Sequence, residues 1–139
     1  MKNKLILCFS ILITSLAYSQ EKLAEITFEN KVIDYGTVEF GIDGKKTFVF
    51  KNTGNAPLIF SRIYSSCGCT IPKKPEKPIE PGDSGSIQVE YDTKRVGPFQ
   101  KAITVNSNAK TPNIVLRIKG EVLPEPEEEE NEDKKIDNK

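Results

Sequence analysis

Two cysteines separated by one residue are the groups in this sequence best suited to chemistry. Cys67 and Cys69 flank Gly68, and Thr70 completes the segment Cys-Gly-Cys-Thr. The chain has 3 cysteines, of which Cys8 lies in an N-terminal apolar run, and it has no histidine. Without histidine the usual general base near neutral pH is missing. We therefore expect no catalytic residues and no enzymatic activity.

Three interpretations of the cysteine pair stay open. Cysteine often behaves as a small apolar residue, so Cys67 and Cys69 can simply pack at the end of a strand. A disulfide across Gly68 is compatible with an oxidising compartment, provided that the two Cα atoms approach within about 4.4–6.8 Å. Such a small loop removes little entropy from the unfolded chain, so the bond would be redox-labile rather than a structural staple.

A soft metal ion held by two thiolates is the third interpretation. Zinc normally takes four ligands, and this chain supplies no histidine and no methionine beyond residue 1. A site at Cys67 and Cys69 would need carboxylates or a second chain, and a lone Cys-x-Cys is a weak signal. We therefore expect no bound metal and no cofactor.

The elements that must position the cysteines are two apolar runs before them. Phe48 and Phe50 alternate with polar neighbours, which is the period of a strand with one buried face. Residues 52–57, Asn-Thr-Gly-Asn-Ala-Pro, favour a turn. The second run, residues 58–64, loses its alternation near Ser61, where we expect a bulge.

The remainder of the chain contains further strand patterns and no helical period. Gly36 allows a turn or bulge after an early strand. The proline-rich segment 72–81 cannot be an inner strand, and we interpret it as a loop that crosses between sheets with Ile79 tucked beneath it. The alternating segments are residues 26–29, 32–35, 45–51, 58–64, 86–92, 99–105 and 114–122. The pattern predicts an all-β fold, an immunoglobulin-like antiparallel β-sandwich of about seven strands.

Both ends of the chain differ in composition from this body. Residues 1–19 have a basic start, an apolar run and small residues before Gln20, which predicts a secretory signal peptide. Residues 20–123 then form the domain, with no integral membrane segment after cleavage. Residues 124–139 carry 8 acidic and 3 basic residues and almost no apolar ones, which predicts a disordered acidic tail.

The charge of the body excludes one class of partner. Residues 20–123 contain 15 basic and 12 acidic residues, and the basic ones are not clustered enough to indicate nucleic-acid binding. The most concentrated group is Lys73, Lys74 and Lys77, but prolines and Glu76 lie among them. We interpret this segment as a solubilising loop.

Six spaced motifs stand out along the body of the chain. Their residues are Gly36, Asn52, Gly54, Cys67, Gly68, Cys69, Thr70, Pro81, Gly82 and Asn106, together with Gly97-Pro98-Phe99. In this order the motifs resemble a known family of secreted bacterial proteins, domain of unknown function 1573, which is similar to the immunoglobulin-like domains of the Hydin, major sperm protein and pilus-chaperone group. The resemblance spans about residues 26–122 and implies a sandwich fold and export, but no catalytic residues.

These observations favour an exported, non-enzymatic domain that acts by binding or spacing, in the periplasm or outside the cell. A protein partner is expected along an edge strand or at the Cys-Gly-Cys-Thr end. The alternative is a periplasmic thiol–disulfide protein that exchanges electrons through Cys67 and Cys69. Binding of a soft metal ranks below both.

Overall fold

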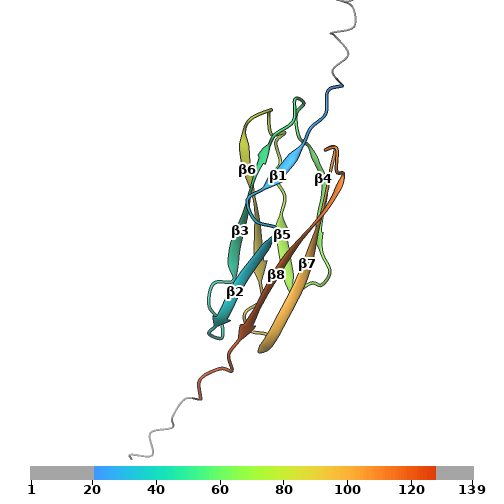
Figure 1. Ribbon diagram of the computed structural model, residues 1–139. Helices are drawn as coiled ribbons and strands as arrows, with labels where there is room; N and C mark the ends of the chain where they lie inside the picture. The colour runs from blue at the N-terminus through green and yellow to red at the C-terminus, as the bar shows by residue number, and fades with distance from the viewer. Residues whose placement is uncertain (1–20, 128–139) are drawn as a thin grey trace, which may run out of the picture.

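Two four-stranded sheets packed face to face make up the protein (Figure 1). The structure, a computed structural model, describes residues 21–127. One sheet has the order β1-β3-β6-β5 and the other β2-β8-β7-β4. The strands are β1 (Ile26–Phe28), β2 (Val32–Val38), β3 (Lys45–Asn52), β4 (Phe60–Ser65), β5 (Thr70–Lys73), β6 (Ser84–Tyr91), β7 (Gly97–Ser107) and β8 (Asn113–Val122).

The predicted all-β, immunoglobulin-like sandwich is confirmed. None of the residues 21–127 lies in a helix, so that part of the chain holds no helix able to span a membrane. The expected signal peptide, residues 1–19, and most of the expected acidic tail lie outside the described residues and stay predictions.

The core lies between the sheets and is built from the alternating residues of the central strands. Burying each large apolar side chain contributes about 1.5–3 kcal/mol before the loss of entropy is counted, so a core of this size needs no cross-link to form. Its fully buried members are Phe48, Phe50, Leu58, Ile87, Val89, Ile103, Val105, Leu116, Ile118 and Val122.

The structure has one strand more than the seven expected, and the chain crosses between the sheets before this strand rather than after it. Residues 70–73 form β5, an edge strand that pairs with β6 although it contains Pro72. Edge strands tolerate proline because one side of the strand needs no hydrogen bonds. The interpretation of residues 72–81 as the crossing loop was wrong, since they connect β5 and β6 within one sheet. The chain crosses between sheets earlier, between Ser65 and Thr70.

Irregularities in β2 and β4 agree with the turn or bulge expected at Gly36 and the bulge expected near Ser61. The register of β2 against β8 shifts between Asp34 and Thr37, and Gly36 has the positive φ of 64° that a bulge of this kind favours. In β4 the register shifts between Phe60 and Arg62, which is the expected bulge near Ser61. The β2–β8 pair is parallel, whereas the other strand pairs are antiparallel.

Candidate functional site

The candidate site is the cysteine turn, residues 66–70, which carries the chain from one sheet to the other. Its start is held to β7, because the amide of Ser66 donates to the carbonyl of Ala102 at 3.0 Å. Its end is held to the residue that follows β6, because the amide of Asp92 donates to the carbonyl of Cys69 at 2.9 Å. Within the turn, the amide of Thr70 donates to the carbonyl of Cys67 at 3.4 Å. Backbone hydrogen bonds therefore position the turn on both sides.

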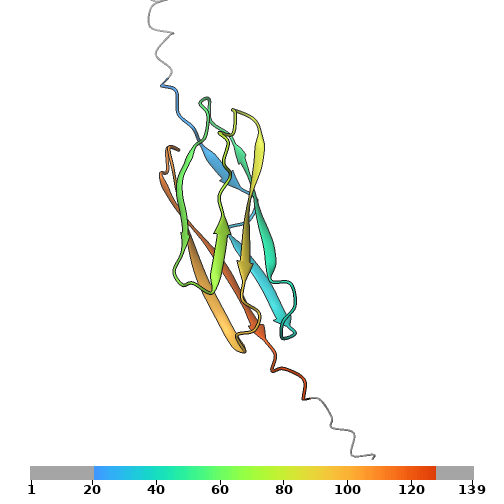
Figure 2. The same ribbon diagram turned by 180° about the vertical axis from the view of Figure 1, so that it is seen from behind.

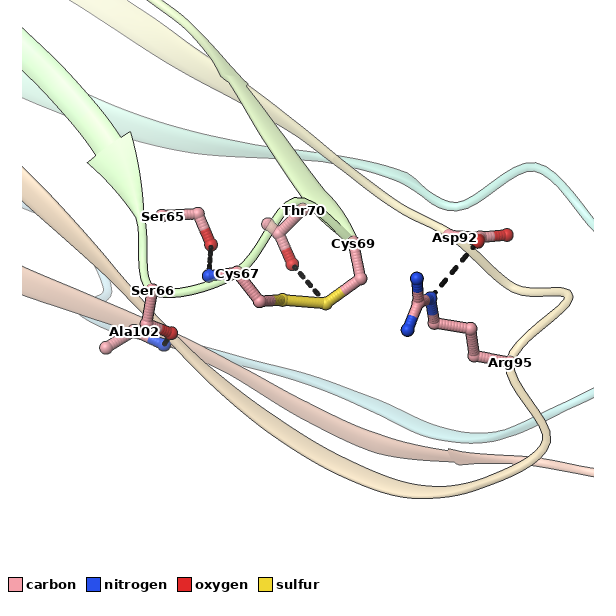
Figure 3. Close-up of a disulfide and its surroundings, with 8 residues drawn as sticks. All are labelled: Ser65, Ser66, Cys67, Cys69, Thr70, Asp92, Arg95 and Ala102. Carbon is pink, nitrogen blue, oxygen red and sulfur yellow. Dashed lines mark hydrogen bonds and ion pairs between the residues drawn. A yellow bond between two sulfur atoms is a disulfide. The ribbon is translucent and has the colours of Figure 1, made fainter.

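A disulfide joins Cys67 to Cys69 inside this turn, with the Cα atoms 5.4 Å apart (Figure 3). Of the three interpretations, the structure has the disulfide, and Cys69 also packs as a small apolar residue, as in the first interpretation. Cys69 is only 5% exposed and belongs to the hydrophobic core, whereas Cys67 is half-buried at the rim of the core and Gly68 is exposed. The hydroxyl oxygen of Thr70 lies 3.9 Å from the sulfur of Cys69. The two sulfurs thus lie in unequal surroundings.

This arrangement limits what the cysteines can do chemically. A sulfur in a disulfide has no thiolate to offer a metal ion, and residues 21–127 contain no cluster of three or more cysteine, histidine or acidic side chains suited to one. The chemistry that remains is thiol–disulfide exchange, in which an incoming thiolate attacks one sulfur and the other leaves. Cys67 is the more accessible of the two.

Aromatic rings pack against one another in the core near the turn. The rings of Tyr91 and Phe99 stack with their centroids 3.8 Å apart, and Tyr35 packs edge-on against Phe99 at 5.4 Å. Burial raises the pKa of Tyr35 to about 12, with a smaller contribution from the charge of Asp43. Its hydroxyl donates to the carbonyl of Gly44 at 2.7 Å.

The charged groups beside the turn are exposed. Arg95 and Asp92 form an ion pair of 3.3 Å that lies to one side of the disulfide in Figure 3. The side chains are 64% and 47% exposed, so the pair adds little to stability. Burial raises the pKa of the Tyr91 hydroxyl, with opposite contributions from Arg95, which lowers it, and Asp92, which raises it.

The crossing leaves part of β7 without a neighbour on one side. The last pairing of β4 joins Ser65 to Ile103, while β7 continues to Gly97. Because peptide groups alternate in direction along a strand, Gln100 points its amide and carbonyl to the same side as Ala102, away from β8. We call residues 97–101 of β7 the open edge. It lies directly beyond the cysteine turn.

The other motif residues are separated from the cysteine turn. Asn52 is fully buried at the far end of β3, and it holds the β3–β4 and β5–β6 connections together. Its side-chain amide donates to the carbonyls of Ala56 at 2.8 Å and Ile79 at 2.9 Å, and its carbonyl oxygen accepts from the amide of Gly54 at 3.0 Å. Figure 2 places these connections at the upper end of the sandwich, whereas the β4–β5 crossing lies lower down.

Gly54 and Gly82 lie in the two connections that Asn52 joins, and Pro81 precedes Gly82 in its turn. A Cβ atom on Gly54 would collide with the backbone of Leu23 to Glu25. The amide of Gly82, whose φ is 87°, donates to the backbone carbonyl of Asn52 at 2.8 Å. We call Asn52 and the backbone segments that it binds the asparagine corner. These motif residues are explained by the fold.

Gly36 and Asn106 lie elsewhere again. The amide of Gly36 bonds to the carboxylate of Asp34 at 2.8 Å inside the bulge of β2. The side-chain amide of Asn106 donates to Asn113 across β7 and β8, and its own Oδ1 is the one buried side-chain polar atom without a partner among the described residues. The predicted residues therefore do not form one site.

Sequence reasoning predicted an edge strand as a binding surface but did not locate the open edge on β7. Its extent depends on where β4 leaves the sheet, and no local pattern in β7 reports that position. The one available signal was Gly97-Pro98, since Pro98 has no amide proton and suits a strand end without a neighbour on that side.

Comparisons with known proteins agree with this fold. A protein of unknown function from Porphyromonas gingivalis W83 matches with a TM-score of 0.65 at 16% identity, over 74% of this chain and 50% of the other, so the chain spans half of that protein's length. The VesB protease of Vibrio cholerae matches with a TM-score of 0.58 at 15% identity, over 81% of this chain and 35% of the protease.

An ASH/PapD-like domain of human CEP192 is similar over nearly its whole length. The TM-score is 0.57 at 12% identity, over 80% of this chain and 93% of that domain. Identities this low show a shared fold alone. No protein with a curated function matches the sequence.

The sequence profile of one family covers most of the described structure. It matches residues 26–122, which run from the first residue of β1 to the last residue of β8. The family is described as protein of unknown function, DUF1573. The chain that forms this sandwich, with its cysteine turn and asparagine corner, therefore belongs to the DUF1573 family.

Proposed function

We propose that this chain is an exported, non-enzymatic module that binds a protein partner at the open edge of β7. The observation that carries the proposal is the position of this edge beside the cysteine turn. The two surfaces expected from the sequence, a strand edge and the Cys-Gly-Cys-Thr end, lie next to each other here. A partner segment would continue the line of β4 and contact Gly68 and Cys67 at its end.

The chemistry of this surface suits an extended peptide. Gln100 offers one amide and one carbonyl, and Pro98 offers a carbonyl, so main-chain pairing would supply affinity as it does in strand addition. The side chain of Lys101 is half-buried on the inner face, past the end of β4, and can contact the partner's side chains. Edges that are left open in this way are candidate sites for pairing with another chain.

Substitution at a single position tests the proposal. Gln100→Pro removes the amide that faces the open edge without removing a hydrogen bond to β8, and Gln100→Ala is the matched control because it keeps that amide. Each variant, checked for folding by circular dichroism, is used to capture partners from a cell-envelope extract. We expect Gln100→Pro alone to lose the captured protein. Equal capture by both variants would refute the role of the edge.

The disulfide supports a second candidate function, thiol–disulfide exchange with an oxidoreductase. The thiolate of a partner dithiol attacks the sulfur of Cys67, the Cys67–Cys69 bond breaks, and Cys69 leaves as a thiolate and takes up a proton. The second partner thiol then attacks the mixed disulfide and releases Cys67, so the partner is oxidised and this chain reduced.

Trapping of the mixed disulfide separates the two functions. An oxidoreductase that lacks its second cysteine should form a covalent adduct with Cys69→Ala after mild oxidation, through Cys67, and not with Cys67→Ala. A reduction potential far below that of the compartment would contradict electron exchange and leave the binding function standing.

A further inference from the structure

A lysine-lined groove lies on the outer face of the β1-β3-β6-β5 sheet, away from the cysteine turn. Its volume is about 620 Å³, and the segment after β5 forms one wall. The floor consists of three polar side chains that point away from the core, Thr47 on β3 and Ser86 and Gln88 on β6. None of these three side chains makes a hydrogen bond within the described residues, so the floor is available to a ligand.

The charge of the groove is positive and largely uncompensated. Lys73, Lys74 and Lys77 line it together with one carboxylate, that of Glu76. The ammonium of Lys74 donates to the carbonyl of Phe60 at 3.1 Å, which leaves two of its three donors free. Neither ion pair found among the described residues involves a lysine of the groove. An acidic, extended segment is the ligand chemistry that fits.

Such a segment exists in this chain. After β8, the amide of Leu123 donates to the carbonyl of Val38 at 2.8 Å, and residues 124–127 alternate proline with glutamate and are exposed. Glu128, Glu129 and Glu130 follow in the sequence. We call residues 123–133 the acidic arm. Prolines keep a segment extended, because they fix φ and restrict the residue before them.

The direction of the arm decides which groove it meets. In Figures 1 and 2, residues 123–127 leave the lower end of the sandwich and lead away from it, rather than back along the outer face of the sheet. The described start of the arm, residues 123–127, therefore does not lead towards the lysine groove of its own molecule, and a second copy is the occupant that we consider.

We propose that the lysine groove binds the acidic arm of a second copy of this chain. The contact is heterologous, because the groove of one molecule takes the arm of the next, so it can add copies in a row unless a ring closes. This association uses surfaces other than the open edge and is independent of the partner proposed above.

Analytical ultracentrifugation of the chain from Gln20 to Lys139 tests the proposal. Measurements at about 0.1 M and about 1 M salt compare screening lengths of about 10 Å and about 3 Å. We expect self-association that grows with protein concentration at the lower salt and is lost at the higher. Monomers at every concentration and at both salts would overturn the proposal, as would association that salt leaves unchanged.

Complementary variants sharpen this test. The groove variant, Lys73→Ser with Lys77→Ser, and the arm variant, Glu127→Gln to Glu130→Gln, should each weaken self-association at least tenfold. A control with Lys31→Ser and Lys94→Ser removes the same charge from exposed positions outside the groove and should associate like the parent chain. Mixing the groove and arm variants should restore a heterodimer and nothing larger, because each copy keeps one working surface.

Three outcomes of the variant experiment would contradict the proposal. Equal weakening by the control would mean that net charge, not the groove, drives association. Failure of the mixture to form a heterodimer would exclude arm-to-groove contact. A contact between arm and groove lysines that is independent of concentration, measured by NMR shifts, would place the arm in the groove of its own molecule instead.

Discussion

The asparagine corner and the cysteine turn both join segments that are far apart in the sequence, but they do so by different means. The asparagine corner relies on one side chain, fully buried, whose hydrogen bonds reach four backbone groups on three segments. The cysteine turn contains a covalent bond, yet that bond closes a loop within a single turn. Its long-range attachment comes from two backbone hydrogen bonds, at Ser66 and Asp92.

The difference shows that a motif's chemistry is a poor guide to its role in stability. A buried polar side chain that satisfies several backbone groups is costly to remove, because those groups are left desolvated without partners. A disulfide between residues two apart constrains the unfolded chain very little. The asparagine corner is thus a determinant of the fold, and the cysteine turn is available for function.

The largest effect is expected from removing the side chain of the asparagine corner. Asn52→Ala should lower the free energy of unfolding by about 3 kcal/mol, because the carbonyl of Ala56 and the amide of Gly54 lose their partner at a partly buried site. The carbonyl of Ile79 loses one of its two partners and keeps the amide of Leu58. Chemical denaturation measures the change. Asn55→Ala is the control, since the hydrogen bonds of the Asn55 side chain to the backbone of Leu23 and Glu21 are exposed to water, and a loss there as large as at Asn52 would contradict the distinction.

Matched glycine substitutions compare the two regions directly. Gly54→Ala should cost about 2 kcal/mol, because the added methyl collides with backbone that cannot move freely. Gly68→Ala should change stability by less than about 0.5 kcal/mol, because a Cβ there meets nothing within 4 Å and the residue is exposed. Thermal melts of both variants check this, and a reversed order would refute it.

Alkaline pH tests a second buried polar contact, between Tyr35 and Gly44. Tyr35 has a pKa of about 12 in the folded protein against 10.0 for the ordinary side chain, so the folded state keeps a proton that the unfolded state has lost. Stability should be unaffected below pH 10 and should fall by about 2 kcal/mol as the pH rises from about 10 to about 12. Tyr35→Phe should remove that part of the pH dependence, and an unchanged profile would contradict the assignment.

The disulfide itself should contribute little to stability. Reduction of Cys67–Cys69 should lower the free energy of unfolding by about 1 kcal/mol or less, because the loop is short and the turn keeps its backbone hydrogen bonds. Melting of the unmodified protein with and without reductant measures this without any substitution. A loss comparable to that of Asn52→Ala would remove the contrast between the two regions.

Much of the fold could be predicted from local pattern. The alternation of Phe48 with Phe50, and of Ile87 with Val89, identified strands and their buried faces. The bulges at Gly36 and near Ser61 followed from interruptions of that alternation. β5 was missed because it has four residues and contains Pro72, which a local rule excludes and an edge position allows.

The candidate site was predictable only in part. Cys67 and Cys69 stand out by residue type, but the sequence left three states of the pair open, with metal binding ranked below the other two. Gly97-Pro98 was the one local signal for the open edge of β7, and the sequence showed the cluster of Lys73, Lys74 and Lys77 without showing the groove that they line. From the sequence, the segment with these lysines was interpreted as a solubilising loop. Only the structure shows that it borders a groove that Thr47 and Gln88 also line.

The sequence alone determined which residues alternate and therefore which side chains enter the core, because the pleat of a strand turns successive side chains to opposite faces. Only the tertiary structure decided which strand lies beside which. Pairing depends on contacts between distant segments, so it alone set where β4 ends, which part of β7 stays open, and why Asn52 is buried. A periodic pattern reports the environment of each strand but contains no information about its neighbours.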